Sequence, residues 1–159
     1  MKTMQHGDNT PMGGHYRRLL VMTALSFVAM YALMYAMVNT FANAYSNLNQ
    51  SYMAGLMTAA MVIIEIVVMS SMYPDRRRNV LVIGISALAL ALCWMGIRQQ
   101  AAITDRQFLR SMIPHHASAI LMCEKSPARD PEIRRLCQGI VSSQQGEIAQ
   151  MKAMLEAAR

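Results

Sequence analysis

The chain has 159 residues, of which 54% are hydrophobic and only 15% charged, so it is too apolar for an ordinary soluble domain of this length. Methionine is unusually frequent, with 17 residues against 3 phenylalanines. The net charge of +6 comes largely from arginines beside apolar segments, so it gives no reason to expect nucleic-acid binding. Composition therefore predicts an all-α membrane protein rich in sulfur.

The first part of the chain, residues 1–16, is polar, contains glycine and lacks hydrophobic periodicity. Such a segment is typical of a disordered lead, here on the cytoplasmic side. It carries four side chains that could contact a metal weakly, although a solvated tail is the favoured interpretation: Met4, His6, Met12 and His15.

Residues 17–98 are predicted to form a membrane region of three spans, at about Leu19–Val38, Tyr52–Tyr73 and Val80–Ile97. Each apolar run approaches the roughly 20 residues that cross a bilayer. The only charged residue between Arg18 and Asp75 is Glu65.

Arginine placement predicts the orientation. Arg17 and Arg18 precede the first span, a run from Arg76 to Arg78 separates the second from the third, and the loop between the first two spans is uncharged. Because positive loops stay in the cytoplasm, we expect a cytoplasmic N-terminus in an inner membrane and a periplasmic or extracellular C-terminal part. The small-residue sequence at residues 42–44 resembles a cleavage site, but the apolar run before it is long for a signal peptide, so an uncleaved helix is favoured.

Methionines recur every three or four residues in the first two spans, around the single acidic residue Glu65. A row at this spacing stays on one side of a helix. It could hold or pass Cu(I), or it could be a packing surface on which Glu65 only pairs with Tyr31, Tyr35 or Thr58. The rows are Met30, Met34 and Met37 in the first span and Met53, Met57, Met61, Met69 and Met72 in the second.

Residues 99–159 are predicted to form a helical hairpin outside the membrane. Its first arm begins with the capping-box pattern of residues 104–107 and is interrupted by Pro114, which should kink it. Its second arm begins after Asp130, a predicted N-cap, with Pro131 in the first turn. Apolar residues recur at helical spacing in both arms.

The predicted metal site lies where polar and thioether side chains of the two arms meet. In an antiparallel hairpin, residues at one level have numbers that sum to about 260, which puts His116 opposite Gln144 and Met112 beside Glu147. Thioether and imidazole ligands favour Cu(I), so the sequence predicts a Cu(I)-preferring site, against the alternative of a hydrogen-bonded polar layer that fixes helix register. The candidate ligands are Met112, His115, His116, Met122, Gln144, Glu147 and Met151.

Cys123 and Cys137 fall at the same predicted level of the hairpin. In an oxidising compartment the simplest interpretation is a disulfide, and the alternative is a thiol pair that joins Met122 in binding Cu(I). Cys93 in the third span has no evident partner.

The block from Asp105 to Leu155 resembles the family called domain of unknown function 305. The Met-Ile-Pro-His-His sequence at 112–116, followed by Gln-x-x-Glu-Ile-x-x-Met at 144–151, carries the resemblance. It implies a ferritin-like helical fold and copper binding in some members, with binding as the function carried over and not catalysis. Two arms are half a four-helix bundle, so we expect a homo-oligomer.

Three functions have to be distinguished for such a sequence. The leading one is a membrane-anchored, outward-facing copper-binding protein for metal tolerance or delivery. The alternative is a structural or oligomerising membrane protein whose His/Gln/Glu cluster only specifies helix packing. A ferritin-like di-iron oxidase is disfavoured because such sites use Glu-x-x-His motifs, which this sequence lacks.

Overall fold

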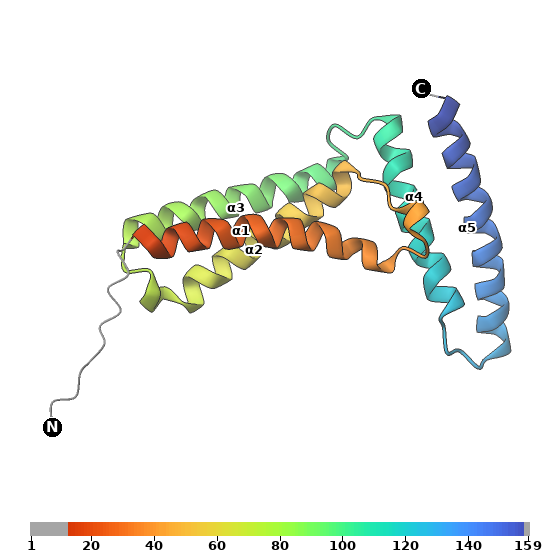
Figure 1. Cartoon of the computed structure of the whole chain (residues 1–159), viewed down its shortest axis with the longest axis horizontal. Coiled ribbons are helices and arrows are strands. Elements are labelled where there is room, and N and C mark those ends of the chain that lie inside the picture. The colour runs from red at the N-terminus through yellow and green to blue at the C-terminus, as the bar shows by residue number, and fades with distance from the viewer. Residues whose placement is uncertain (1–12, 158–159) are drawn as a thin grey trace.

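The computed structural model describes residues 13–157, and over that range the chain is all-helical. Two parts are visible in Figure 1: three long helices lie lengthwise side by side, and a helical hairpin lies across one end of them. The long helices are α1 (Gly13–Leu33), α2 (Leu48–Val68) and α3 (Arg76–Gln99), and the hairpin is α4 (Asp105–Glu124) and α5 (Pro131–Ala157). Short 3-10 turns are η1 (Met34–Met37), η2 (Phe41–Asn43) and η3 (Ser70–Met72).

The three long helices are each long and apolar enough to cross a membrane. Large apolar side chains on their outer surfaces stay exposed, including Leu25 on α1, Val68 on α2 and Leu88 on α3. Soluble proteins rarely expose so extended an apolar surface, whereas lipid covers it in a membrane. The membrane part predicted from the sequence is therefore confirmed. Each helix begins a few residues before its predicted start, whereas α1 and α2 end before Val38 and Tyr73, where 3-10 turns follow them.

The structure differs from the prediction at the end of the N-terminal lead, which we expect to comprise residues 1–16. Residues 1–12 lie outside the described residues, but α1 already begins at Gly13, so residues 13–16 are helical. Tyr16 explains this extension: its hydroxyl lies 2.8 Å from the Asn79 side-chain oxygen, and its ring packs against Tyr73 and beneath the Arg78 guanidinium. These contacts tie the start of α1 to the start of α3, at the end remote from the hairpin.

The caps of the hairpin helices are those that the sequence predicts. The Thr104 hydroxyl accepts from the Gln107 backbone N–H at 3.4 Å, and Asp130 accepts from the Glu132 N–H at 2.7 Å, with Pro131 as the first residue of α5. Pro114 lies inside α4, which continues through it from Asp105 to Glu124. The side chain of Pro114 is buried, so the ring adds to the packing of the helix whose hydrogen bonding it weakens.

A single apolar cluster holds α4 against α5 and reaches the ends of the spans nearest the hairpin. Val38 and Tyr45, from the connection between α1 and α2, pack against it. Each large side chain buried in this way contributes roughly 1.5–3 kcal/mol. The cluster consists of Ile113, Ala117, Ile120, Ile148, Met151 and Leu155.

Polar contacts also attach α4 to the membrane part. The Gln107 side-chain oxygen accepts from the backbone N–H of Leu48, the first residue of α2, at 3.0 Å. Arg110 donates to the Ser46 hydroxyl at 2.8 Å, and the Tyr52 hydroxyl donates to the Ala101 carbonyl at 2.9 Å. The Gln107 side chain therefore satisfies a free backbone donor at the start of α2. The capping-box pattern predicts instead that this side chain bonds to the N-cap backbone of its own helix, α4.

Candidate functional site

The centre of the predicted site is a contact between the two arms of the hairpin. His116 on α4 places Nδ1 3.0 Å from Oε2 of Glu147 on α5. The geometry does not make a hydrogen bond, so Nδ1 is a buried nitrogen without a hydrogen-bond partner. The other carboxylate oxygen, Oε1, accepts from the Ser143 hydroxyl at 2.8 Å. Native proteins rarely leave a buried nitrogen without such a partner, so Nδ1 of His116 is a candidate position for a bound ion.

Burial lowers the pKa of His116, and the neighbouring His115 lowers it further, while the Glu147 carboxylate acts in the opposite direction. The net lowering favours a neutral imidazole near neutral pH. Neutral imidazole is the form that binds a metal ion.

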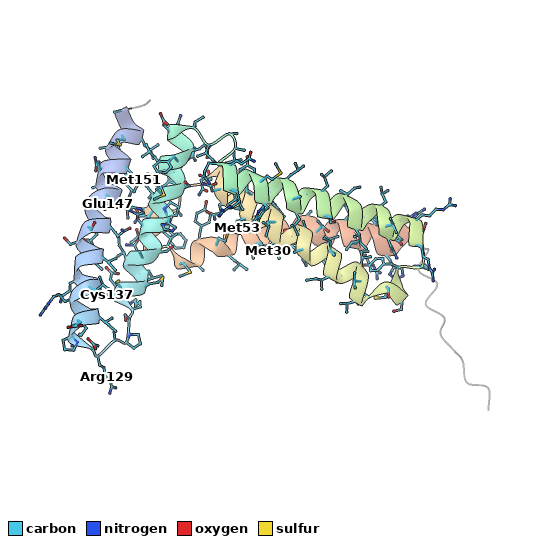
Figure 2. All side chains as sticks on the ribbon, turned by 180° about the vertical axis from the view of Figure 1, so that it is seen from behind. Met30, Met53, Arg129, Cys137, Glu147 and Met151 are labelled. Atoms are coloured by element: carbon cyan, nitrogen blue, oxygen red, sulfur yellow. The ribbon has the colours of Figure 1, made fainter. Side chains whose placement is uncertain are left out.

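Two of the predicted thioethers lie in the apolar cluster between the same two arms. Met151 is one of its buried members, and Met112, one helical turn before His116, packs against it. Figure 2 shows Met151 beyond Glu147 on α5, on the way to the C-terminus, with Cys137 towards the turn. The structure thus brings a carboxylate, an imidazole and two thioethers to one region of the interface between α4 and α5.

Two other predicted ligands lie elsewhere. His116 faces Glu147 and not Gln144, because the arms pair about three residues later at this level than predicted. Gln144 instead lines a groove on α5 with Leu136 and Ile140. Met122 is 60% exposed, so it is not part of the interface between the arms. On α5, Ile133 and Leu136 are exposed, whereas Val141 packs against the apolar cluster between the arms.

His115 turns to a different side of α4 from His116. Its imidazole is exposed and lines a cavity of about 300 Å³ between α4 and the ends of α1 and α2 nearest the hairpin. The ring centroids of the two histidines are 6.0 Å apart. Met112 lines this cavity too, and Met34 and Met53 face it from the membrane part. The sequence identifies Met34 and Met53 as members of the methionine rows in the first two spans. It gives no signal that they lie beside the same cavity as His115.

The cysteines of the hairpin are neighbours, as predicted. Both thiols are free in this structure. A hydrogen bond with the Cys137 thiol is the main reason why the pKa of Cys123 is raised. They lie beside a cavity of about 490 Å³ near the turn, which Glu124 and Arg134 also line. Cys93, the third free thiol, is in α3, where its sulfur lies close to Gly55 of α2.

Glu65 has a different partner from those expected. Its Oε1 accepts from the Tyr73 hydroxyl at 3.3 Å, whereas the Thr58 hydroxyl lies 3.5 Å from the Met30 sulfur and the Tyr35 hydroxyl donates to the Tyr45 carbonyl. Tyr73 follows α2 closely enough to fold back on it, which the sequence spacing alone did not indicate.

The structure shows no group of three or more His, Cys, Asp or Glu side chains suited to a metal ion among residues 13–157.

Comparison with known proteins gives two matches. The model of the family described as domain of unknown function (DUF305) matches residues 95–155, which span the end of α3 and nearly all of the hairpin. An uncharacterized protein of Acanthamoeba polyphaga mimivirus is 35% identical over 141 residues, covering 87% of this chain and 91% of the viral protein. That similarity therefore includes the membrane helices as well as the hairpin. Solved structures gave no significant match.

Proposed function

The chain belongs to the DUF305 family, and on that premise we propose that it is a membrane-anchored copper-binding protein, with a preference for Cu(I), that serves metal tolerance or delivery. The observation that carries the proposal is the buried, unsatisfied Nδ1 of His116 beside the Glu147 carboxylate, next to an apolar cluster that holds Met112 and Met151. These four side chains are the proposed ligands of the hairpin site.

The donor set supports copper over harder cations. Two thioethers and an imidazole are soft or borderline donors, which favour Cu(I), whereas Mg²⁺ and Ca²⁺ require several oxygen ligands. Glu147 contributes the one negative charge, which would offset a monovalent cation. The surrounding apolar side chains, such as Ile113 and Ile148, would restrict water at the ion.

The proposal includes an orientation. Arg17 and Arg18 and the arginines at the start of α3 lie at the end of the spans remote from the hairpin. With positive loops in the cytoplasm, the hairpin faces outward, into the periplasm of a Gram-negative cell. A reporter that is active only in the cytoplasm, fused after Arg159, should be silent, and activity there would reverse the assignment.

The decisive experiment measures Cu(I) binding by the full chain in detergent, under reductant, by competition with a coloured Cu(I) chelator. The double variant His116→Gln, Met151→Leu should weaken binding at the hairpin by at least about tenfold, equivalent to about 1.4 kcal/mol. The matched control is Met154→Leu, an exposed methionine of α5 one turn from Met151. Unchanged affinity and stoichiometry in the double variant would refute the hairpin site.

One observation favours the structural alternative. Since His116 and Glu147 contact each other directly, this pair could serve only to align α4 with α5. In that case, the same double variant would lower the free energy of unfolding or change the oligomeric state, while copper binding by the wild-type chain would be absent. Measuring unfolding and metal content on the same samples separates the two functions.

A further inference from the structure

We propose that the cavity between the hairpin and the membrane helices is a second, separate Cu(I) site, formed by Met34, Met53, Met112 and His115. The inference deepens the proposed function, on which it rests for the identity of the metal. It adds ligands from the membrane part to a site that the hairpin alone cannot complete.

Three segments distant in sequence build the cavity. Met34 begins η1 at the outer end of α1, Met53 lies in the second turn of α2, and Met112 and His115 lie three residues apart on α4. Residues three apart on a helix share a face, so Met112 and His115 both reach the same cavity. Figure 2 shows Met53 close to the junction with the hairpin and Met30 farther along the membrane part.

The position of α4 over this cavity is held by contacts independent of the proposed ligands. Gln107 accepts from Leu48, Arg110 donates to Ser46, and the Asn49 amide lies 3.4 Å from the Ser111 hydroxyl. The donors of α4 are thereby kept opposite those of α1 and α2, which is the preorganisation that a binding site requires.

The lining selects a soft, singly charged ion. It contains three thioethers, one imidazole and neutral amides such as Asn49 and Gln50, and no carboxylate. Cations that need oxygen ligands and compensating charge are therefore poorly served, whereas Cu(I) or its closed-shell analogue Ag(I) binds neutral sulfur and nitrogen donors. The cavity, at about 300 Å³, is larger than a bare ion, but the flexible methionine side chains can close on it.

The cavity also has a distinct place relative to the hairpin site. His115 serves the junction while His116 serves the interface between α4 and α5, and Met112 borders both. Two adjacent histidines on one helix would thus hold ions on two sides of it, with one thioether between them. This arrangement provides neighbouring sites along which Cu(I) can pass between the membrane surface and the hairpin by ligand exchange.

The test uses the full chain in detergent under reductant, with Cu(I) counted by chelator competition. Met34→Leu together with Met53→Leu should remove one bound Cu(I) per chain, or weaken it by at least about tenfold, because leucine keeps the volume but has no sulfur. The control pair is Met37→Leu and Met57→Leu, both partly exposed methionines of the same segments that do not line the cavity. It should bind as the wild type does.

A second measurement needs no variant. With methyl-labelled methionine, the signals of Met34 and Met53 should shift together on titration with Ag(I), and static signals would overturn the junction site.

The outcomes separate the two proposals. If the junction pair binds as the wild type does and only His116→Gln with Met151→Leu loses copper, the junction site is wrong and the hairpin site stands. If only the junction pair, Met34→Leu with Met53→Leu, loses copper, the hairpin site is wrong and the junction site stands. Wild-type protein that binds no copper overturns both.

Discussion

His116 on α4 and Glu147 on α5 approach to 3.0 Å between Nδ1 and Oε2, within an interface that is otherwise mainly apolar. Burial is the largest influence on the imidazole and lowers its pKa, and the nearby carboxylate only partly opposes this. The folded hairpin therefore favours neutral His116, while the unfolded chain titrates near the ordinary value of about 6.5.

The first prediction concerns pH and stability. Below about pH 6.5 the unfolded state binds the His116 proton more readily than the folded state, so the free energy of unfolding should fall as pH falls through this value. The loss should continue until the pH is below the lowered pKa of the folded state. His116→Gln should remove this part of the slope. Unfolding curves of the full chain at several pH values measure it.

His115→Gln is the matched control for the pH prediction, because His115 is exposed and turns away from α5. It should retain most of the slope, and equal slopes in His116→Gln and the wild type would contradict the prediction. The same lowering of the His116 pKa means that copper bound at the hairpin should persist somewhat below pH 6.5, the ordinary value for a histidine.

The second prediction concerns the thiols of Cys123 and Cys137. Oxidised glutathione should convert them into an internal disulfide, which for a loop of about 15 residues stabilises a fold by roughly 3 kcal/mol. The raised pKa of Cys123 should make the reaction slow at neutral pH and faster in mild alkali. Mass spectrometry and unfolding with and without reductant check this. Cys123→Ser should abolish the gain, whereas Cys93→Ser should keep it.

The order of elements was predictable from the sequence because its signals are local. Apolar runs in which Glu65 is the one charged residue indicate the spans, and Thr104 and Asp130 mark where the hairpin helices begin. The docking of the hairpin was not predictable in the same way. It depends on contacts such as that of Gln107 with Leu48, which join residues 59 positions apart and leave no periodic pattern.

The candidate site was predictable in part for the same reason. Antiparallel pairing of two helices brings Cys123 to Cys137 and His116 near Glu147 within about one turn, which is the precision that counting levels allows. Counting levels could not decide whether Gln144 or Glu147, three residues apart, lies opposite His116. Nor could it assign His115 to the junction cavity, because that requires the position of the membrane helices relative to α4.

The third prediction concerns self-association. Leu136 is 63% exposed beside a groove of about 640 Å³ on α5, and a two-helix hairpin is half of a four-helix bundle. We expect a second copy to cover this face, so Leu136→Glu should shift the chain from oligomer to monomer. Gln145→Glu adds the same charge on the opposite side of α5 and should leave the oligomer intact. Light scattering of the detergent-solubilised chain distinguishes them, and a wild-type monomer would refute the expectation.

The fourth prediction concerns Glu65 and Tyr73 at the end of the spans remote from the hairpin. Tyr73 is only 5% exposed, and its hydroxyl donates to the Glu65 carboxylate. Glu65→Gln keeps an acceptor oxygen and should be tolerated, whereas Glu65→Leu leaves the buried hydroxyl without a partner and should cost about 1–3 kcal/mol. Tyr73→Phe combined with Glu65→Leu should recover much of that loss, because both polar groups are then gone. Thermal unfolding in detergent measures all three.

The fifth prediction concerns the methionine row in α2 and uses Glu65→Gln together with variants of the row itself. Met53 lines the junction cavity at the hairpin end of α2. Met57, 41% exposed, and Met69, 37% exposed, face outward within one chain, so the row does not line an enclosed path. We therefore expect Met57→Leu and Met61→Leu to leave copper tolerance of cells unchanged, since these swaps conserve volume at under about 1.5 kcal/mol. Glu65→Gln should be equally neutral for tolerance. Sensitivity to copper in Glu65→Gln cells, with folding and the hairpin site intact, would instead assign the carboxylate to metal movement through the membrane, because it is the one negative charge within the spans.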